Sequence, residues 1–188
     1  MGGITLVTGG ARSGKSRFAE TLATRGRTVC YVATAEALDA EMADRITQHR
    51  ARRPQQWTTL EAPRDLAAPL AAIRDADTVL VDCLSLWTSN RLLALGDDEA
   101  PGWWGDVATL EETLTMELNA IMTQARQSGW DLVLVTNETG FGVVPASRLG
   151  RAFRDLLGRL SQVVAAEADA VYLVVAGLAV ELKTLAAR

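Results

Sequence analysis

The chain is poor in several chemically important residues. Among its 188 residues there is one histidine, His49, and the 19 basic residues include only two lysines, Lys15 and Lys183. Any role that needs an imidazole or an ammonium group therefore has very few candidates. No apolar run reaches the roughly 18 residues of a membrane-spanning helix. No cationic, apolar signal segment opens the chain. We expect a cytoplasmic protein that does not insert into membranes.

The chain also has few cysteines and no net positive charge. Cys30 and Cys83 lie in apolar runs, which favours two reduced core thiols over a disulfide or a metal site. The net charge of −4 argues against nucleic acid and anionic membranes as general partners. The balance of 48% hydrophobic and 22% charged residues is that of a globular protein. The length corresponds to about one domain, so we expect a single domain over residues 1–188.

Short apolar runs alternate with segments of helical periodicity. Strands are expected at 4–8, 28–33, 78–82, 131–136, 171–175 and 178–182, the last two forming a hairpin around Gly177. Helices are expected at 15–25, 38–52, 63–73, 84–95, 106–127 and 148–166. This alternation predicts an α/β fold with three layers, α/β/α, around a mostly parallel sheet. Ligands of such sheets bind beyond the C-terminal ends of the strands.

The segment after the first expected strand has the pattern G-x-x-x-x-G-K-[ST] of a phosphate-binding loop (P-loop). It consists of Gly9, Gly10, Ala11, Arg12, Ser13, Gly14, Lys15 and Ser16. Its backbone N–H groups and the following helix N-terminus bind phosphates. Lys15 reaches the β- and γ-phosphates, and Ser16 ligates Mg²⁺. A glycine turn with a chance lysine is the alternative, which the strand and helix on either side disfavour. We expect a P-loop NTPase-type fold and a nucleoside triphosphate ligand.

Asp82 ends another apolar strand, which is where the second Mg²⁺-organising acid of such sites lies. Asp82 is therefore a candidate for both metal and nucleotide binding. The alternative is that Asp82 caps the next helix.

His49 lies on the helix expected after the second strand. Arg45 and Arg53 share its helical face, and Arg50 and Arg52 lie close by. Such a cluster suits a triphosphate, which makes Arg50 and Arg53 nucleotide-binding candidates. Neighbouring cations disfavour the protonated imidazole, and a neutral imidazole is a nucleophile toward phosphorus. The hypothesis is that His49 forms a phosphoramidate. Spacing alone favours the alternative, a solvated basic helix with an incidental histidine.

The P-loop is one of several segments that together resemble a known family. The others are 31–35, 39–42, 45–50 with 53–54 and Trp57, 80–84, 88–90, 136–145, 148, 153–155, 158–159 and 173–177. They resemble the bifunctional adenosylcobinamide kinase / adenosylcobinamide-phosphate guanylyltransferase family of cobalamin biosynthesis. The resemblance covers nearly the whole chain, and its segment 136–145 is more particular than the P-loop alone.

The resemblance implies two activities. The first phosphorylates the aminopropanol hydroxyl of adenosylcobinamide with ATP or GTP. The second transfers GMP from GTP to that phosphate, which gives adenosylcobinamide-GDP and pyrophosphate. In the family a histidine carries the GMP, and this role falls on His49. The family's GTP contacts fall on the P-loop and on Ala33, Thr34, Ala35, Glu61 and Asp82. Family members look like homotrimers.

The sequence leaves the kinase base and the roles of the tryptophans open. Asp82 and Glu138 are candidates for the kinase base by position only, and Asn137 and Glu138 are equally suited to capping a turn. Trp57, Trp103 and Trp104 either contact the corrinoid ring or pack in the core or an interface, and packing is favoured. Two other functions remain: a simple small-molecule P-loop kinase without a covalent intermediate, and a nucleotide-switched binding protein.

Overall fold

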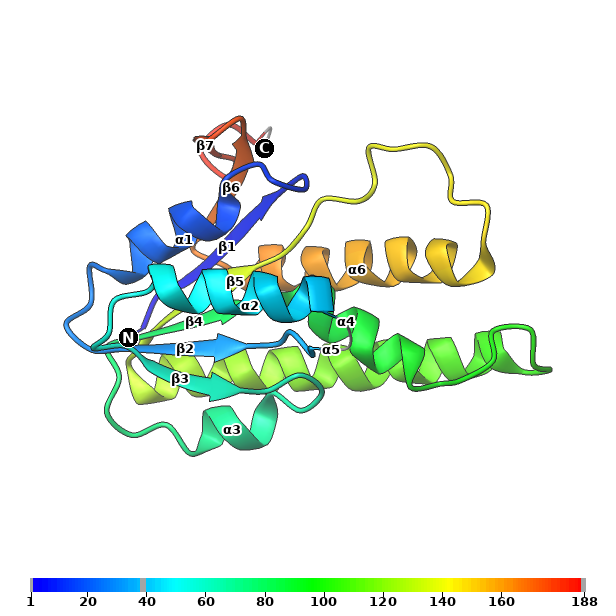
Figure 1. Ribbon diagram of the computed structural model, residues 1–188, viewed down its shortest axis with the longest axis horizontal. Coiled ribbons are helices and arrows are strands. Elements are labelled where there is room, and N and C mark those ends of the chain that lie inside the picture. Colours follow the sequence, from blue (N-terminus) through cyan, green and yellow to red (C-terminus); the bar gives the residue numbers. More distant parts are fainter. Residues whose placement is uncertain (1, 38–39, 187–188) are drawn as a thin grey trace.

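A single sheet organises the part of the chain that the computed structural model describes, residues 2–37 and 40–186 (Figure 1). Its seven strands have the order β3-β2-β4-β5-β1-β6-β7. They are β1 (Ile4–Gly9), β2 (Val29–Ala33), β3 (Thr58–Glu61), β4 (Thr78–Asp82), β5 (Asp131–Val135), β6 (Ala170–Val175) and β7 (Leu178–Glu181). Neighbouring strands run parallel except β6 and β7, which form the predicted C-terminal hairpin.

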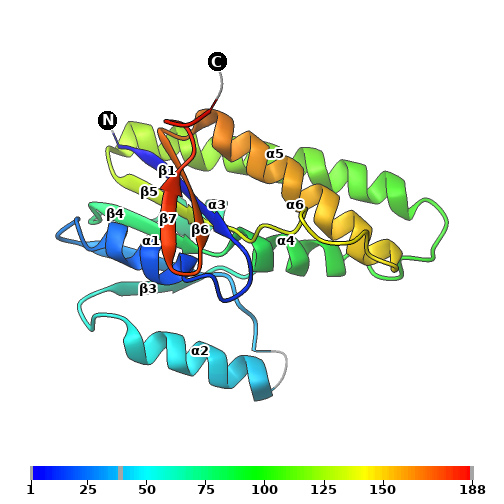
Figure 2. The same cartoon turned by 90° about the horizontal axis from the view of Figure 1, so that it is seen from above.

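Helices cover both faces of this sheet, as Figure 2 shows. They are α1 (Lys15–Ala23), α2 (Ala40–Arg52), α3 (Ala67–Ala71), α4 (Leu84–Leu93), α5 (Trp103–Ser128) and α6 (Arg148–Glu167). The long helices α5 and α6 lie on one face, and α1 lies on the other, with α2 beyond it on the same side. The predicted α/β/α architecture with a mostly parallel sheet is confirmed.

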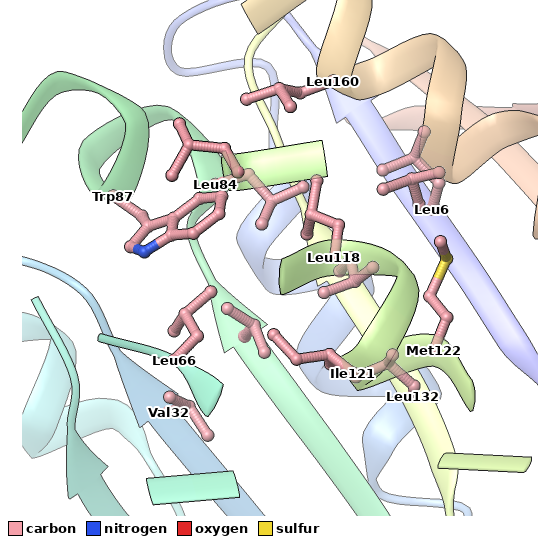
Figure 3. Packing of buried hydrophobic residues seen from close by; sticks show 14 of the residues in the cluster. Leu6, Val32, Leu66, Leu84, Trp87, Leu118, Ile121, Met122, Leu132 and Leu160 are labelled. Atoms are coloured by element: carbon pink, nitrogen blue, oxygen red, sulfur yellow. The ribbon is translucent and has the colours of Figure 1, made fainter. Parts of the chain in front are cut away.

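Alternating strand residues build two separate apolar layers. On β2, Cys30 and Val32 belong to the larger cluster under α4, α5 and α6, whereas Tyr31 belongs to the cluster under α1. Figure 3 shows the larger cluster, in which Leu118 of α5 and Trp87 of α4 lie near the sheet. Burial of these side chains is the main source of stability.

Three elements differ from the prediction. Strand β3 was not expected, because it is only four residues long and its mostly polar residues are exposed at the sheet edge. The helix expected at 63–73 is confined to α3, Ala67–Ala71. Helix α5 begins at Trp103, inside the expected loop, because Gly102 adopts a left-handed conformation (φ 84°) and starts the helix. The start expected for the 38–52 helix lies outside the described residues.

The two cysteines are buried and free, as predicted. Burial raises the pKa of Cys83 to about 11, so this side chain is a neutral thiol at physiological pH. Across residues 2–37 and 40–186, none of the helices has the length and apolarity needed to cross a membrane.

Candidate nucleotide site

The P-loop joins β1 to α1 and is held by its backbone on two sides. The N–H of Gly177, in the β6–β7 turn, donates to the Ser13 carbonyl oxygen (2.8 Å), and the Glu138 N–H donates to the Gly9 oxygen (3.0 Å). A Cβ on Gly9 would lie 2.4 Å from the Val174 oxygen, and one on Gly14 would lie 3.2 Å from the Gly177 Cα. Both positions therefore require glycine. The loop is a fixed cradle.

Polar groups inside the cradle are available to an anion. Lys15 is buried, and its ammonium group donates to the Gly10 carbonyl oxygen (3.2 Å). Burial lowers the pKa of Lys15, although nearby Cys83 and Asp82 act in the opposite direction. The Ser13 hydroxyl is buried and has no hydrogen-bond partner among the described residues. A phosphate oxygen would satisfy such a group.

Asp82 lies beside the P-loop, as the sequence indicated. Its Oδ1 accepts a hydrogen bond from the Ser16 hydroxyl (3.3 Å), and its Oδ2 accepts one from the Tyr31 hydroxyl (2.9 Å). The residue that caps α4 is Cys83, and no side chain caps that helix end. The alternative in which Asp82 serves as a helix cap is therefore wrong.

The oxygen atoms of Ser16 and Asp82 fit a Mg²⁺ ion. Mg²⁺ is a hard cation that proteins usually hold through one or two carboxylates together with substrate phosphates. The described residues contain no cluster of three or more His, Cys, Asp and Glu side chains that would form a cage of protein ligands alone. A hydroxyl and one carboxylate next to a phosphate cradle match the first arrangement.

The segment after β2 is fixed to the start of α4. The Thr34 hydroxyl donates to the Cys83 carbonyl oxygen and accepts from the Cys83 N–H, both at 2.7 Å. The Asn90 amide donates to the Thr34 carbonyl oxygen (2.9 Å). Because Ala33, the last residue of β2, pairs with Asp82 across the sheet, the predicted contacts Ala33, Thr34 and Ala35 begin beside Asp82.

A cavity of about 380 Å³ opens at the C-terminal end of α2. It is lined by Arg50, Arg53, Pro54, Gln55, Trp57, Thr59 and Glu61. Arg50 forms an ion pair with Glu61. The Arg53 guanidinium lies 3.5 Å from the centre of the Tyr31 ring, and its Nε and Nη1 have no hydrogen-bond partner among the described residues. Unsatisfied guanidinium N–H groups suit a phosphate. We call these seven residues the α2 cavity.

His49 is half-buried in the last turn of α2, one residue before Arg50 and four before Arg53. The side chain of Arg45, predicted on the same face, lies outside the described residues. A series of contacts leads from this end of α2 to the P-loop, from Arg53 to the Tyr31 ring, then to Asp82 and Ser16.

Tyr31 is the site residue that the sequence did not reveal. The available signal was its position, since it is the one aromatic residue of β2 and lies two residues before the strand end. Alternation puts it on the same face as Asp82, which the pairing of Ala33 with Asp82 confirms. Burial and then the Asp82 carboxylate raise the pKa of Tyr31, so the hydroxyl keeps the proton that it donates.

The structure shows the surroundings of Glu138 and of the three tryptophans, whose roles the sequence left open. The Glu138 carboxylate accepts a hydrogen bond from the Gly140 N–H (2.5 Å), so it forms the turn that was one of its alternatives. Trp103 is 1% exposed and packs in the core, whereas Trp104 is 46% exposed. Trp57 lines the α2 cavity.

Comparison with known proteins identifies the family. Residues 5–182 match the model of the family described as cobinamide kinase / cobinamide phosphate guanyltransferase. The chain belongs to this family. It is 44% identical over 181 residues to the bifunctional adenosylcobalamin biosynthesis protein CobU of Salmonella typhimurium, covering 96% of this chain and 99% of the relative. Its identity to CobP of Pseudomonas aeruginosa, also named a bifunctional adenosylcobalamin biosynthesis protein, is 45% over 180 residues, or 95% and 96% of the two chains.

Among solved structures, the chain matches the P4 protein from bacteriophage phi6 in complex with ADP. The identity is 18% and the TM-score 0.41, over 94% of this chain and 52% of that protein, so the chain spans about half the length of P4.

Proposed function

We propose that this protein phosphorylates adenosylcobinamide with ATP or GTP and then transfers GMP from GTP to the product. Membership of the cobinamide kinase / guanyltransferase family supports the reaction class. The observation that carries the proposal is the contact series from the P-loop through Asp82 and Tyr31 to the arginines of the α2 cavity. It gives one nucleotide both a phosphate cradle and a neighbouring cationic surface.

In the kinase reaction the P-loop backbone and Lys15 bind the triphosphate. The aminopropanol hydroxyl oxygen forms a bond to the γ-phosphorus as the bond to the nucleoside diphosphate breaks, and the hydroxyl proton is released to water; this displacement chiefly needs positioning and charge stabilisation. Ser16 and Asp82 would hold Mg²⁺. When bound, this ion neutralises charge on the phosphate oxygens.

In the guanylyltransferase reaction His49 acts as the nucleophile. Its neutral imidazole forms a bond to the α-phosphorus of GTP and pyrophosphate leaves, so His49 carries GMP as a phosphoramidate. A phosphate oxygen of adenosylcobinamide phosphate then attacks the same phosphorus, which restores the imidazole. The unsatisfied N–H groups of Arg53, and Arg50 beside it, would stabilise charge on the transferred phosphoryl group.

Glu61 and the segment Ala33–Ala35 complete the proposed nucleotide site. Glu61 lines the α2 cavity, where its carboxylate accepts from Arg50. The same carboxylate is an acceptor for the N–H groups on the edge of a guanine base. In this arrangement the base occupies the cavity and the phosphates point toward the P-loop.

The proposal includes a cytoplasmic homotrimer. Free buried thiols fit a reducing compartment. Phe141 and Val143, in the loop after β5, are 85% and 95% exposed, and Leu178 on the hairpin is also exposed. Exposed apolar residues close together in one loop, such as Phe141 and Val143, are candidates for a subunit interface. Light scattering of the purified protein tests for the trimer.

The two reactions are tested separately. Incubation with adenosylcobinamide and γ-³²P-ATP or γ-³²P-GTP is expected to label the corrinoid. With adenosylcobinamide phosphate and α-³²P-GTP, labelled adenosylcobinamide-GDP and pyrophosphate are expected. Transfer of the γ-phosphate without transfer of GMP would contradict the proposal in favour of a simple kinase. Nucleotide hydrolysis without transfer to either corrinoid would favour a nucleotide-switched binding protein.

A further inference from the structure

Tyr31 occupies a buried position between the P-loop and the α2 cavity. Its side chain is 2% exposed. The Trp57 ring is stacked with it at 6.5 Å between centres, and the Arg53 guanidinium lies on its face at 3.5 Å. These contacts hold the phenol ring in place, so its hydroxyl oxygen has a fixed position.

That hydroxyl donates to one oxygen of a carboxylate whose other oxygen faces the P-loop. The Tyr31 hydroxyl lies 2.9 Å from Asp82 Oδ2, and the Ser16 hydroxyl lies 3.3 Å from Asp82 Oδ1. A carboxylate with only one fixed partner can rotate about its terminal torsion, which is a broad, soft rotation. The second hydrogen bond removes that freedom and leaves Oδ1 directed at Ser16.

We propose that Tyr31 is a positioning residue, which fixes the orientation of the Asp82 carboxylate for Mg²⁺-dependent nucleotide binding. Outer partners of metal-binding carboxylates commonly act in this way. The inference deepens the proposed function, because it uses the same nucleotide site. Arg53 and Trp57 pack on the Tyr31 ring. They therefore connect the occupancy of the α2 cavity to the orientation of the Asp82 carboxylate.

The test compares nucleotide affinity with and without the metal ion. Calorimetry measures binding of α,β-methylene-GTP, which His49 cannot cleave, in Mg²⁺ and in EDTA. Tyr31→Phe keeps the ring and removes the hydroxyl. It is expected to reduce the Mg²⁺-dependent gain in affinity about three- to tenfold, a loss of the size that removal of one typical hydrogen bond causes. Affinity in EDTA is expected to stay unchanged.

The chain offers a matched control and a double-mutant cycle. Tyr172 is its other tyrosine; it packs against Phe18 in an edge-to-face contact. Tyr172→Phe is expected to leave the Mg²⁺-dependent gain unchanged. In an Asp82→Asn background, Tyr31→Phe is expected to have no further effect, because no carboxylate remains to be oriented. An unchanged gain in Tyr31→Phe, or an equal loss in both backgrounds, would overturn the proposal.

A second measurement uses the wild-type chain and does not depend on the folding of a variant. With only two tyrosines, ¹³C labelling at the phenol carbon gives two NMR signals. Adding Mg²⁺ to the protein bound to α,β-methylene-GTP is expected to shift the Tyr31 signal and not that of Tyr172. No shift would overturn the proposal. Failure of corrinoid transfer in a protein that passes both tests would overturn only the proposed function.

Discussion

The P-loop and the end of α2 differ in how firmly the fold holds them. The P-loop is bonded by its backbone to the β6–β7 turn and to the segment after β5, and its lysine is buried. At the end of α2, the Arg50 and Glu61 side chains that form an ion pair are 54% and 66% exposed, and α2 lies outside the layer of α1 (Figure 2). The cradle proposed to bind phosphate in both reactions is thus built into the sheet, whereas the proposed nucleophile of GMP transfer, His49, lies on a peripheral helix.

The largest expected effect tests whether the P-loop serves both reactions. Lys15→Ala removes the cation of the cradle and is expected to lower the rates of kinase and GMP transfer by about 10²- to 10³-fold, as loss of a charge-stabilising group does. Lys183→Ala is the control, since this lysine donates to the carbonyl oxygens of Ala166 and Ala168. Radiolabel transfer measures both rates. A full kinase rate in Lys15→Ala would remove the P-loop from the reaction.

A smaller effect is expected from loosening the contact between the P-loop and the β6–β7 turn. Gly14 has φ +97°, and a Cβ there would lie 3.2 Å from the Gly177 Cα. Gly14→Ala introduces strain of about 1–2 kcal/mol and is expected to weaken GTP binding about tenfold in calorimetry. Gly158→Ala, where a Cβ meets open space in α6, is expected to raise stability by about 0.5–1 kcal/mol. Equal affinities in the two variants would show that the cradle is not rigid.

At the end of α2, the comparison predicts that a substitution lowers one activity and not the other. Glu61→Gln breaks an exposed ion pair, so the free energy of unfolding is expected to change by less than about 1 kcal/mol. GMP transfer from GTP is expected to fall several-fold while phosphorylation with ATP continues. Glu111→Gln breaks a pair with Arg159 between α5 and α6, and both activities are expected to persist. Equal losses of both activities in Glu61→Gln would contradict the division of roles.

The smallest expected effect is a change in folding stability at β1, the strand that leads into the P-loop. The Ile4 N–H donates to Asp169 Oδ2 (2.7 Å), and this hydrogen bond is the main reason why the pKa of Asp169 lies below its usual 3.8. A depressed pKa stabilises the fold above pH 3.8, and this contribution is lost as the pH falls through the folded-state pKa. Asp169→Asn is therefore expected to lower Tm slightly at pH 7 and less at pH 2.

For Asp169→Asn, the free energy of unfolding is expected to fall by less than about 1 kcal/mol, because the carboxylate is more than half exposed. Thermal unfolding of wild type and variant at both pH values measures it. A Tm difference that grows toward acid pH would contradict the assigned sign.

The sequence predicted the P-loop side well because its signals are local. The spacing from Gly9 to Ser16 defines the loop, and Asp82 was found because it ends an apolar strand. Parallel pairing then brings strand ends together, as expected for a sheet of this class. The remaining contact, from the Gly177 N–H to the Ser13 oxygen, depends on how the hairpin turn lies and has no sequence signature.

The α2 side was harder to predict because it depends on pairing between distant segments. The arginines near His49 were visible as a cluster, but the cavity exists because β3 pairs with β2 and brings Glu61 beside Arg50. Strand β3 is four residues long and mostly exposed, so it carries little hydrophobic pattern. Tyr31 was missed for a similar reason, since its partner Asp82 lies on another strand.

The central claim is that His49 carries GMP. The direct measurement is incubation with α-³²P-GTP, denaturation, and a search for retained label that is acid-labile and stable to base. The account predicts label on the wild type and on Gln48→Ala, and none on His49→Ala, which should still phosphorylate adenosylcobinamide. Label of equal amount on His49→Ala, or GMP transfer by an unlabelled wild type, would contradict it.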